Sequence, residues 1–186
     1  VATLHERRGG ALPRDLHLRR MQLALRCSAI VVHNAAHAAE LERCPVEVIP
    51  HGIRPPVTVD LAAAKRALAH DATRPDIAHF GFVNPDKAIE EVIHAVAKLR
   101  HGPLPDLCYL VCGGTFPTAQ SRQHLERLRY LSNQLGIADH VKLSGEFLDD
   151  ANLVRVLSAS DWIVLNYRTG MGQSASGAVR HAFMAG

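Results

Sequence analysis

The sequence lacks the features that would assign it to a special class of protein. Its 186 residues include four cysteines, no Cys-x-x-Cys pair, and only 5% aromatic residues. Cysteines this sparse are not typical of a disulfide-stapled secreted domain, so we expect reduced thiols and a cytoplasmic protein. No apolar run approaches the roughly 18 residues of a membrane-spanning helix, and the first residues of the sequence do not show the pattern expected of a signal peptide.

The charge is low and nearly balanced. Lys and Arg exceed Asp and Glu by three, with twelve histidines counted as neutral. A surplus this small does not predict nucleic-acid binding, but it is compatible with an anionic small molecule or a membrane surface. Segment 14–26 combines arginines with leucines at helical spacing, which fits either a helix packed on its own domain or one lying on an anionic bilayer.

Short apolar runs alternate with segments of helical periodicity. Strands are expected at 1–4, 29–32, 46–49, 77–82, 107–112, 141–144 and 162–166, and helices at 59–69, 86–100, 119–135, 149–158 and from about 177 onward. Apolar strands separated by amphipathic helices predict parallel sheets covered on both faces. We therefore predict an α/β fold with doubly wound parallel sheets and a domain boundary near Pro55 and Pro56.

In such folds ligands bind beyond the carboxyl ends of the strands. Lys87 follows the strand expected at 77–82, where a flexible ammonium can bind a phosphate; a solvated lysine is the alternative. The small residues Ser174 to Gly177 lead into the last helix, whose N-terminal N–H groups can also bind an anion. The alternative is that Ser176 only caps that helix.

Six segments occur in an order that resembles a known family. They read VATLHE, VEVIPHGI, HFGFVNPDKAIEEVIHAVAKL, LVCGG, VKLSGEFLDDANLVRVLSASDWIVLNY and SGAVRHAFMAG. Together they resemble the GT-B-fold retaining glycosyltransferases of family 4 (glycosyl transferases group 1). The resemblance implies two Rossmann-like domains, with 1–52 as the end of the acceptor domain and 53–186 as most of the nucleotide-sugar domain. It also implies an internal fragment, with the N-terminal half mostly missing and little activity alone.

The resemblance assigns two catalytic positions. Lys87 matches the family lysine that binds the donor phosphate, in a motif like GFxRPxKG that here reads GFVNPDKA. Asn84 stands where many members carry arginine or an apolar residue, and Ala88 stands where glycine is usual. His5 matches a histidine that reaches toward the transferred sugar or its phosphate, with a structural histidine as the alternative.

The resemblance also assigns the donor-binding positions. Gly113 and Gly114 match places where base and ribose approach the backbone, and Phe147 is expected either against the base or in the core. Two family glutamates, in a pattern like ExFGxxxxE, fall on Gln173 and His181, so both carboxylates are absent. Gln173 can still hydrogen-bond a sugar hydroxyl and His181 a ribose hydroxyl. The full donor-binding set also contains Asn84, Ser176, Gly177 and Ala178.

The resemblance therefore implies sugar transfer, with retention of configuration, from a UDP- or GDP-sugar to a glycan, lipid or small-molecule acceptor. No metal or other cofactor is expected, and peripheral contact with the inner membrane surface is compatible with the basic segment. The alternative is a non-catalytic relative that binds a nucleotide sugar or acts as a scaffold. A nucleotide-dependent dehydrogenase is disfavoured because no GxGxxG follows any strand. The donor base, sugar, acceptor and oligomeric state stay open.

Overall fold

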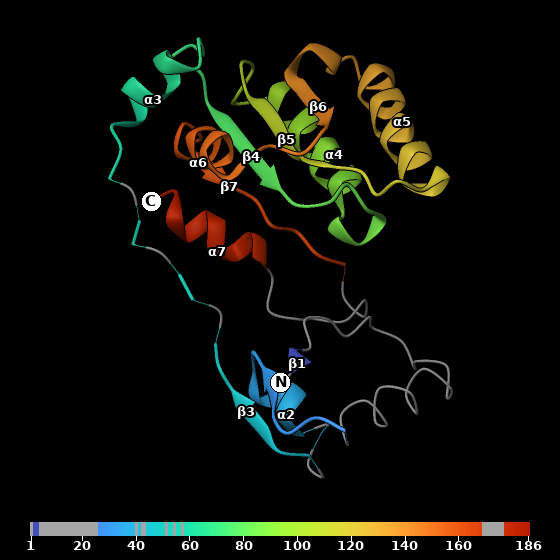
Figure 1. The fold of residues 1–186 in the computed structure, drawn as a ribbon. Helices are drawn as coiled ribbons and strands as arrows, with labels where there is room; N and C mark the ends of the chain where they lie inside the picture. The colour runs from blue at the N-terminus through green and yellow to red at the C-terminus, as the bar shows by residue number, and fades with distance from the viewer. Residues whose placement is uncertain are drawn as a thin grey trace. The chain divides into compact units, whose positions relative to one another are not determined.

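The structure, a computed structural model, describes residues 2–3, 26–39, 41, 44–50, 52–53, 55–56, 58–168 and 177–186 (Figure 1). It divides into two compact units, Val1–Ile53 with Thr169–Arg180, and Arg54–Arg168 with His181–Gly186. The assignment of acceptor binding to one part and donor binding to the other stays a prediction.

The first unit contains a small parallel sheet. Its strands are β1 (Ala2–Thr3), β2 (Ile30–Val32) and β3 (Val46–Val48), in the order β1-β2-β3. The short helix α2 (Ala35–Ala39) follows β2. Ile30, Val32 and Leu41 form the buried core of this unit, as expected for an apolar strand covered by a helix. Segment 14–25, expected to be helical, lies outside the described residues.

The second unit contains a four-stranded parallel sheet. Its strands are β4 (Asp76–Phe80), β5 (Cys108–Gly114), β6 (Val141–Gly145) and β7 (Trp162–Ile163), arranged in the order β6-β5-β4-β7. The helices are α3 (Leu61–Ala67), η1 (Pro85–Lys87), α4 (Ile89–Arg100), α5 (Ala119–Gln134), η2 (Ala138–His140) and α6 (Asp150–Ser158). The last helix, α7 (Gly177–Met184), is divided between the two units after Arg180. The α/β class predicted from the sequence is confirmed.

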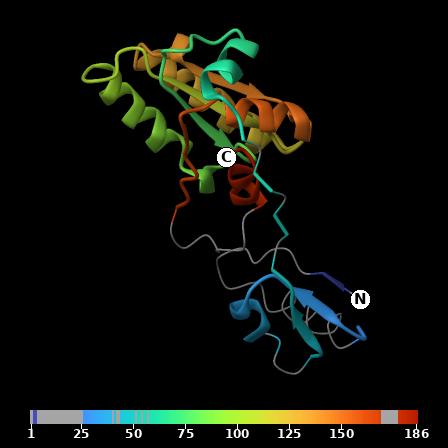
Figure 2. The same ribbon diagram turned by 90° about the vertical axis from the view of Figure 1, so that its left-hand side faces the viewer.

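Helices cover both faces of this sheet (Figure 2). On one face, residues of α4 and α5, such as Ile93 and Leu128, pack against Tyr109 and Val111 of β5. On the other face, residues of α6 pack against the side chains of β4 and β5 that point the opposite way. Because successive residues of a strand point to opposite faces, β5 contributes to both cores and is buried along its whole length.

A buried ionic cluster lies at the amino ends of β4 and β7. The Lys65 ammonium of α3 donates to Asp161 Oδ2 at 2.6 Å and to the carbonyl oxygen of Arg74. Asp161 Oδ2 also accepts from the Asp76 N–H at 2.7 Å, and the Asp76 side chain pairs with Arg74 and His70. Lys65 and Asp76 are both buried, and the pairing of Lys65 with Asp161 and of Asp76 with Arg74 offsets their desolvation. The cluster joins α3 to the sheet.

Three expectations need correction in detail. The helix expected at 86–100 is interrupted, because Ala88 adopts a left-handed conformation (φ 49°) between η1 and α4. Gly113 and Gly114 belong to β5, since Gly114 still pairs with Gly145 of β6. The strand expected at 162–166 is only two residues long, since β7 pairs with β4 at Trp162 and Ile163 only among the described residues.

Candidate functional site

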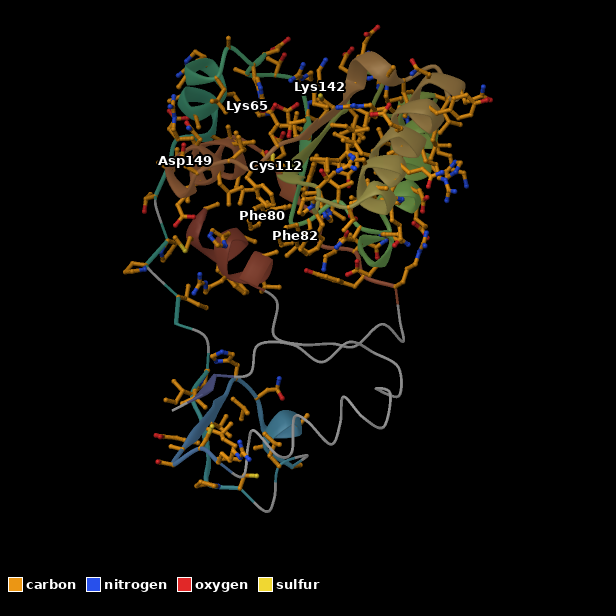
Figure 3. The ribbon with its side chains drawn as sticks, turned by 45° about the vertical axis from the view of Figure 1, so that its right-hand side comes forward. Lys65, Phe80, Phe82, Cys112, Lys142 and Asp149 are labelled. Atoms are coloured by element: carbon orange, nitrogen blue, oxygen red, sulfur yellow. The ribbon has the colours of Figure 1, made fainter. Side chains whose placement is uncertain are left out.

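The strand order creates a topological switch point at the carboxyl ends of β4 and β7. The chain moves outward from β4 through β5 to β6, then returns to place β7 on the other side of β4. At such a point the loops that follow the two adjacent strands diverge, which leaves room for a ligand. Figure 3 shows Phe80 and Phe82 at this edge, with Lys65 and Lys142 toward the opposite edge. The loops after β4 and β7 therefore define the candidate site.

Lys87 lies at this switch point, in the turn that follows β4. Its Nζ is 3.0 Å from Asp86 Oδ2 and 4.3 Å from the centre of the Tyr167 ring. The side chain is 19% exposed, and its binding of a phosphate stays a prediction. An aromatic face and a neighbouring carboxylate both stabilise an ammonium. Here Tyr167 and Asp86 hold the Lys87 ammonium beside the carboxyl ends of β4 and β7.

The segment after β7 is anchored to the start of α4. The Val164 N–H donates to the carbonyl oxygen of Ala78 at 2.8 Å, and the Arg168 N–H donates to that of Asp86 at 3.0 Å. The Arg168 guanidinium pairs with Glu90 at 2.6 Å and with Glu91 at 2.8 Å. These contacts place Tyr167 against Lys87. Arg168 thus helps to position the segment that carries Tyr167 through its contacts with Glu90, Glu91 and Asp86.

His79 lies beneath the site, fully buried in β4. Its Nδ1 is 3.1 Å from the carbonyl oxygen of Val164, a contact that assigns the proton to Nδ1. Burial lowers the pKa of His79 to about 4, so the ring is neutral near pH 7. Its Nε2 has no hydrogen-bond partner among the described residues. The ring therefore connects β4 to the segment after β7 without adding charge.

Glycines bring the loop after β4 close to the end of β5. A methyl group on Gly113 would overlap the carbonyl oxygen of Gly81 and lie 2.8 Å from its carbonyl carbon. Gly81 has φ 133°, which disfavours any residue with a side chain. The Gly81 N–H donates to the Cys112 oxygen and the Val83 N–H to the Gly114 oxygen. Glycine at 113 is thus required for this crossing.

Three phenylalanines, the aromatic cluster, follow three neighbouring strands. Phe82 follows β4, Phe116 follows β5 and Phe147 follows β6. The Phe82 and Phe116 rings stack with centres 4.0 Å apart and 8° between planes, and Phe147 meets Phe82 edge to face at 5.2 Å. Phe147 is 64% exposed, so the alternative that it is a core residue is wrong. Its contact with the base stays a prediction.

Asn84 points toward the first turn of α5. Its Oδ1 accepts from the hydroxyl of Ser121 at 3.4 Å, a long and weak hydrogen bond. Ser121 is buried next to the Thr118 cap that opens α5. The carbonyl oxygen of Asn84 accepts a hydrogen bond from the Lys87 N–H at 3.0 Å. The structure thus brings Asn84 and Lys87 into one turn, and donor contact by Asn84 stays a prediction.

The remaining expected residues lie on or before α7. His5, Gln173 and Ser176 lie outside the described residues. Gly177 and Ala178 begin α7, and their approach to a phosphate stays a prediction. His181 packs its ring edge against Phe80 at 5.0 Å, with Nε2 3.8 Å from Asp150 Oδ1. Its contact with a ribose hydroxyl also stays a prediction.

Two features are absent from the described part of the chain. It contains no group of three or more His, Cys, Asp or Glu residues placed to hold a metal ion. None of its helices is both long enough and apolar enough to span a bilayer.

Sequence reasoning missed several residues of this site. Asp86, Tyr167 and Arg168 follow the two strands at the switch point, and Phe82 and Phe116 complete the aromatic cluster. Each of them comes within a few residues after a strand. That position was the available signal, but contact between distant segments of the chain could not be read from it.

The fold and the switch-point site define a class of protein, the Rossmann-like halves of GT-B glycosyltransferases. Sucrose-phosphate synthase from Thermosynechococcus elongatus has a similar structure, with a TM-score of 0.72 and 21% identity over 96% of this chain and 46% of that one. HepE from Anabaena, solved with UDP and glucose, has a TM-score of 0.72 and 18% identity over 94% of this chain and 47% of its own. At these identities the similarity shows the fold.

Sequence comparison identifies the family. Residues 62–179 match the model of the family described as glycosyl transferases group 1, and the chain belongs to that family. A D-inositol 3-phosphate glycosyltransferase from Mycobacterium sp. (strain KMS) is 35% identical over 107 residues, which are 57% of this chain and 22% of the relative. The chain thus spans about a fifth of the length of that curated relative and about half of each solved structure.

Proposed function

We propose that the second unit binds the diphosphate of a nucleotide sugar, and that the protein transfers the sugar to an acceptor with retention of configuration, as in family 4. The observation that carries the proposal is the Lys87 ammonium at the switch point of β4 and β7. Anionic ligands favour such a point, and a flexible ammonium can follow the charge of a leaving phosphate. Membership of the glycosyl transferases group 1 family supports the same reaction class.

In the proposed reaction Lys87 stabilises the negative charge that develops on the departing diphosphate. Asp86 neutralises the ammonium at 3.0 Å before the donor binds, and the diphosphate replaces that partner. His5 and the amides of Gly177 and Ala178 add further contacts to the sugar or its phosphate. Retention follows if the leaving phosphate accepts the proton of the acceptor on the face that it leaves.

The proposed donor is a UDP- or GDP-sugar. Support comes from solved structures of similar fold, since HepE was solved with UDP and with UDP-glucose, and a trehalose-6-phosphate protein from E. coli with UDP-2-fluoro glucose. The proposed acceptor is a glycan, a lipid or a small molecule, and no metal takes part. We place the protein in the cytoplasm, with peripheral contact to the inner membrane surface, because four cysteines in 186 residues, without a Cys-x-x-Cys pair, are not typical of a secreted domain.

Titration calorimetry with UDP and GDP tests the donor site on the chain itself. Replacing Lys87 with Ala removes a charge-assisted hydrogen bond worth about 1.5–3 kcal/mol, so the dissociation constant should rise roughly 10- to 150-fold. Lys98→Ala is the matched control, because Lys98 is an exposed lysine in the last turn of α4. Equal affinity of Lys87→Ala and Lys98→Ala for both nucleotides would refute the site.

A second candidate function is nucleotide-sugar binding without catalysis. It is favoured by Gln173 and His181, which replace two family carboxylates, and by the packing of the His181 ring against Phe80. The two functions separate in an assay for release of UDP from UDP-sugars, or GDP from GDP-sugars, with acceptor present. Tight binding without turnover would favour the non-catalytic relative.

A further inference from the structure

We infer that Arg168 is a positioning residue for the Lys87 ammonium, which it prepares for a phosphate by fixing Tyr167 against it. This inference rests on the proposed function, because it concerns the same ammonium that binds the diphosphate there. It goes beyond that function in naming a residue that acts on binding without touching the ligand. The carboxylates that hold Arg168 belong to Glu90 and Glu91, in the first turn of α4.

The Arg168 guanidinium lies between two carboxylates. Its Nε donates to Glu91 Oε1 at 2.9 Å, and its Nη2 donates to Glu90 Oε2 at 2.6 Å. The backbone N–H of Arg168 donates to the carbonyl oxygen of Asp86 at 3.0 Å. A guanidinium that bridges two carboxylates keeps one orientation better than a single ammonium does, because its donors form a rigid fork. These three hydrogen bonds therefore fix both the backbone and the side chain of Arg168.

Glu90 is held from a second side by α5. Its Oε1 lies 3.9 Å from Nδ1 of His124, a buried residue of that helix. Burial lowers the pKa of His124 below its ordinary value, so the ring is neutral near pH 7 and Arg168 supplies the positive charge that pairs with Glu90. The Glu90 carboxylate thus joins α4, α5 and the segment after β7 at one place.

Tyr167 precedes Arg168 and lies over the Lys87 ammonium. Its ring centre is 4.3 Å from Lys87 Nζ, and Asp86 Oδ2 is 3.0 Å from the same atom. A free lysine side chain loses much conformational entropy when a ligand fixes it. Here Tyr167 and Asp86 restrict Lys87 before any ligand arrives, so binding costs less. Removal of the Arg168 side chain would release the segment that carries Tyr167 and would return this freedom to Lys87.

Direct contact between Arg168 and the phosphate is the alternative. Among the described residues, a phosphate would have to displace two carboxylates, Glu90 and Glu91, from Arg168, but only Asp86 from Lys87. Separating a guanidinium from two carboxylates costs more than separating an ammonium from one. The arrangement therefore favours Lys87 as the residue that binds the phosphate and Arg168 as its support.

The experiment measures binding of inorganic pyrophosphate and UDP to the 186-residue chain by titration calorimetry. Arg168→Ala and Glu90→Gln are each made in the wild type and in Lys87→Ala, which gives two double-mutant cycles. Arg129→Ala is the matched control. Arg129 of α5 also pairs with a carboxylate, that of Glu126 at 2.7 Å, and also donates to a backbone carbonyl oxygen.

Fixing one long side chain in advance is worth roughly two- to tenfold in affinity. We expect Arg168→Ala and Glu90→Gln to weaken binding of pyrophosphate and of UDP by this factor in the wild type. In the Lys87→Ala background neither change should weaken binding further, because the ammonium through which they act is gone. Arg129→Ala should bind both ligands as the wild type does.

Proton–carbon NMR of the lysine Cε groups reports on the position of Tyr167 directly. The sequence has four lysines, so the Lys87 signal is assigned by its loss in Lys87→Ala. Protons over an aromatic face are shielded, so the Cε protons of Lys87 should lie upfield in the wild type. In Arg168→Ala they should move toward the signal of the exposed Lys98. Fluorescence of Trp162, the one tryptophan in the sequence, checks that each variant folds.

Four other results would overturn the inference. If Glu90→Gln tightens pyrophosphate binding, the freed Arg168 contacts the phosphate itself. If Arg168→Ala weakens binding equally with and without Lys87, it acts on the fold and not through the ammonium. If Arg168→Ala binds as the wild type does while Lys87→Ala binds weakly, the diphosphate site stands and Arg168 does not position it. If the wild type binds neither ligand, the proposed function fails and this inference fails with it, whereas a shifted Lys87 signal would still show that Arg168 holds Tyr167.

Discussion

Replacing Gly113 with Ala should destabilise the second unit and distort the turn that carries Lys87. The added methyl would lie 2.8 Å from the carbonyl carbon of Gly81, whereas carbon atoms in contact lie about 3.5–4.0 Å apart. Both contacting groups are backbone, so no side-chain rotation relieves the overlap. The loop after β4 must therefore move by about 1 Å, and Lys87, six residues further on, moves with it.

The cost can be worked from the contacts that hold this loop. Movement of the loop would break two backbone hydrogen bonds, from Gly81 to Cys112 and from Val83 to Gly114. Each contributes about 0.5–1.5 kcal/mol to stability. Val83 is fully buried, and its partial displacement adds about 1 kcal/mol. Replacing glycine by alanine also stabilises the folded protein by about 0.4–1 kcal/mol, because alanine lowers the conformational entropy of the unfolded chain. We expect a net loss of about 2–3 kcal/mol.

Urea unfolding followed by Trp162 fluorescence measures this loss, because Trp162 lies in β7 of the same sheet. Gly102→Ala is the control: its methyl would meet its nearest neighbour at 3.4 Å, an ordinary contact, and its stability should stay within about 0.5 kcal/mol of the wild type or rise slightly. Equal unfolding free energies for Gly113→Ala and Gly102→Ala would refute the reasoning. Weakened pyrophosphate binding by Gly113→Ala should accompany the instability.

Three further predictions concern single groups in or below the site. Tyr109→Phe removes a buried hydroxyl that has no partner among the described residues, so urea unfolding should show equal stability or a gain of up to about 2 kcal/mol; a loss above 1 kcal/mol would contradict this. Asp86→Asn frees the Lys87 ammonium from a carboxylate at 3.0 Å. Calorimetry should then show pyrophosphate binding up to about fivefold tighter, and weaker binding would refute the role of Asp86. The buried His79 has a folded pKa of about 4 against 6.5 unfolded, so the unfolded state binds more protons between these values. Stability should fall by about 3 kcal/mol as the pH drops from 6.5 to 4, and His79→Asn should lose less over this range; an equal loss would exclude His79 as the cause.

Local patterns in the sequence were sufficient for the elements themselves. The helices α3, α5 and α6 begin after Asp60, Thr118 and Asp149, whose side chains accept from N–H groups of the first turn. Such caps act within four residues and can be read directly from the sequence. Apolar runs between them gave the strands β4, β5 and β6 to within two residues at each end. The α/β class follows from this alternation.

The interruption at Ala88 could not be read in the same way. Its neighbours show helical periodicity, and alanine is the strongest helix former, yet the residue is left-handed. The turn must leave β4 at the switch point and then enter α4 so that Ile89 and Ile93 face the sheet. Buried contacts of that kind outweigh the intrinsic preference of one residue.

The sequence by itself determined the α/β class, the apolar strands, and the position of Lys87 just beyond β4, because these depend on residues close together in the chain. Only the tertiary structure decided the order β6-β5-β4-β7, the contact of Lys87 with Tyr167, and the joining of Phe82, Phe116 and Phe147 into one surface. The physical reason is that strand pairing and burial act between segments tens of residues apart. Periodicity within a segment shows which face it buries, but not which neighbour covers that face.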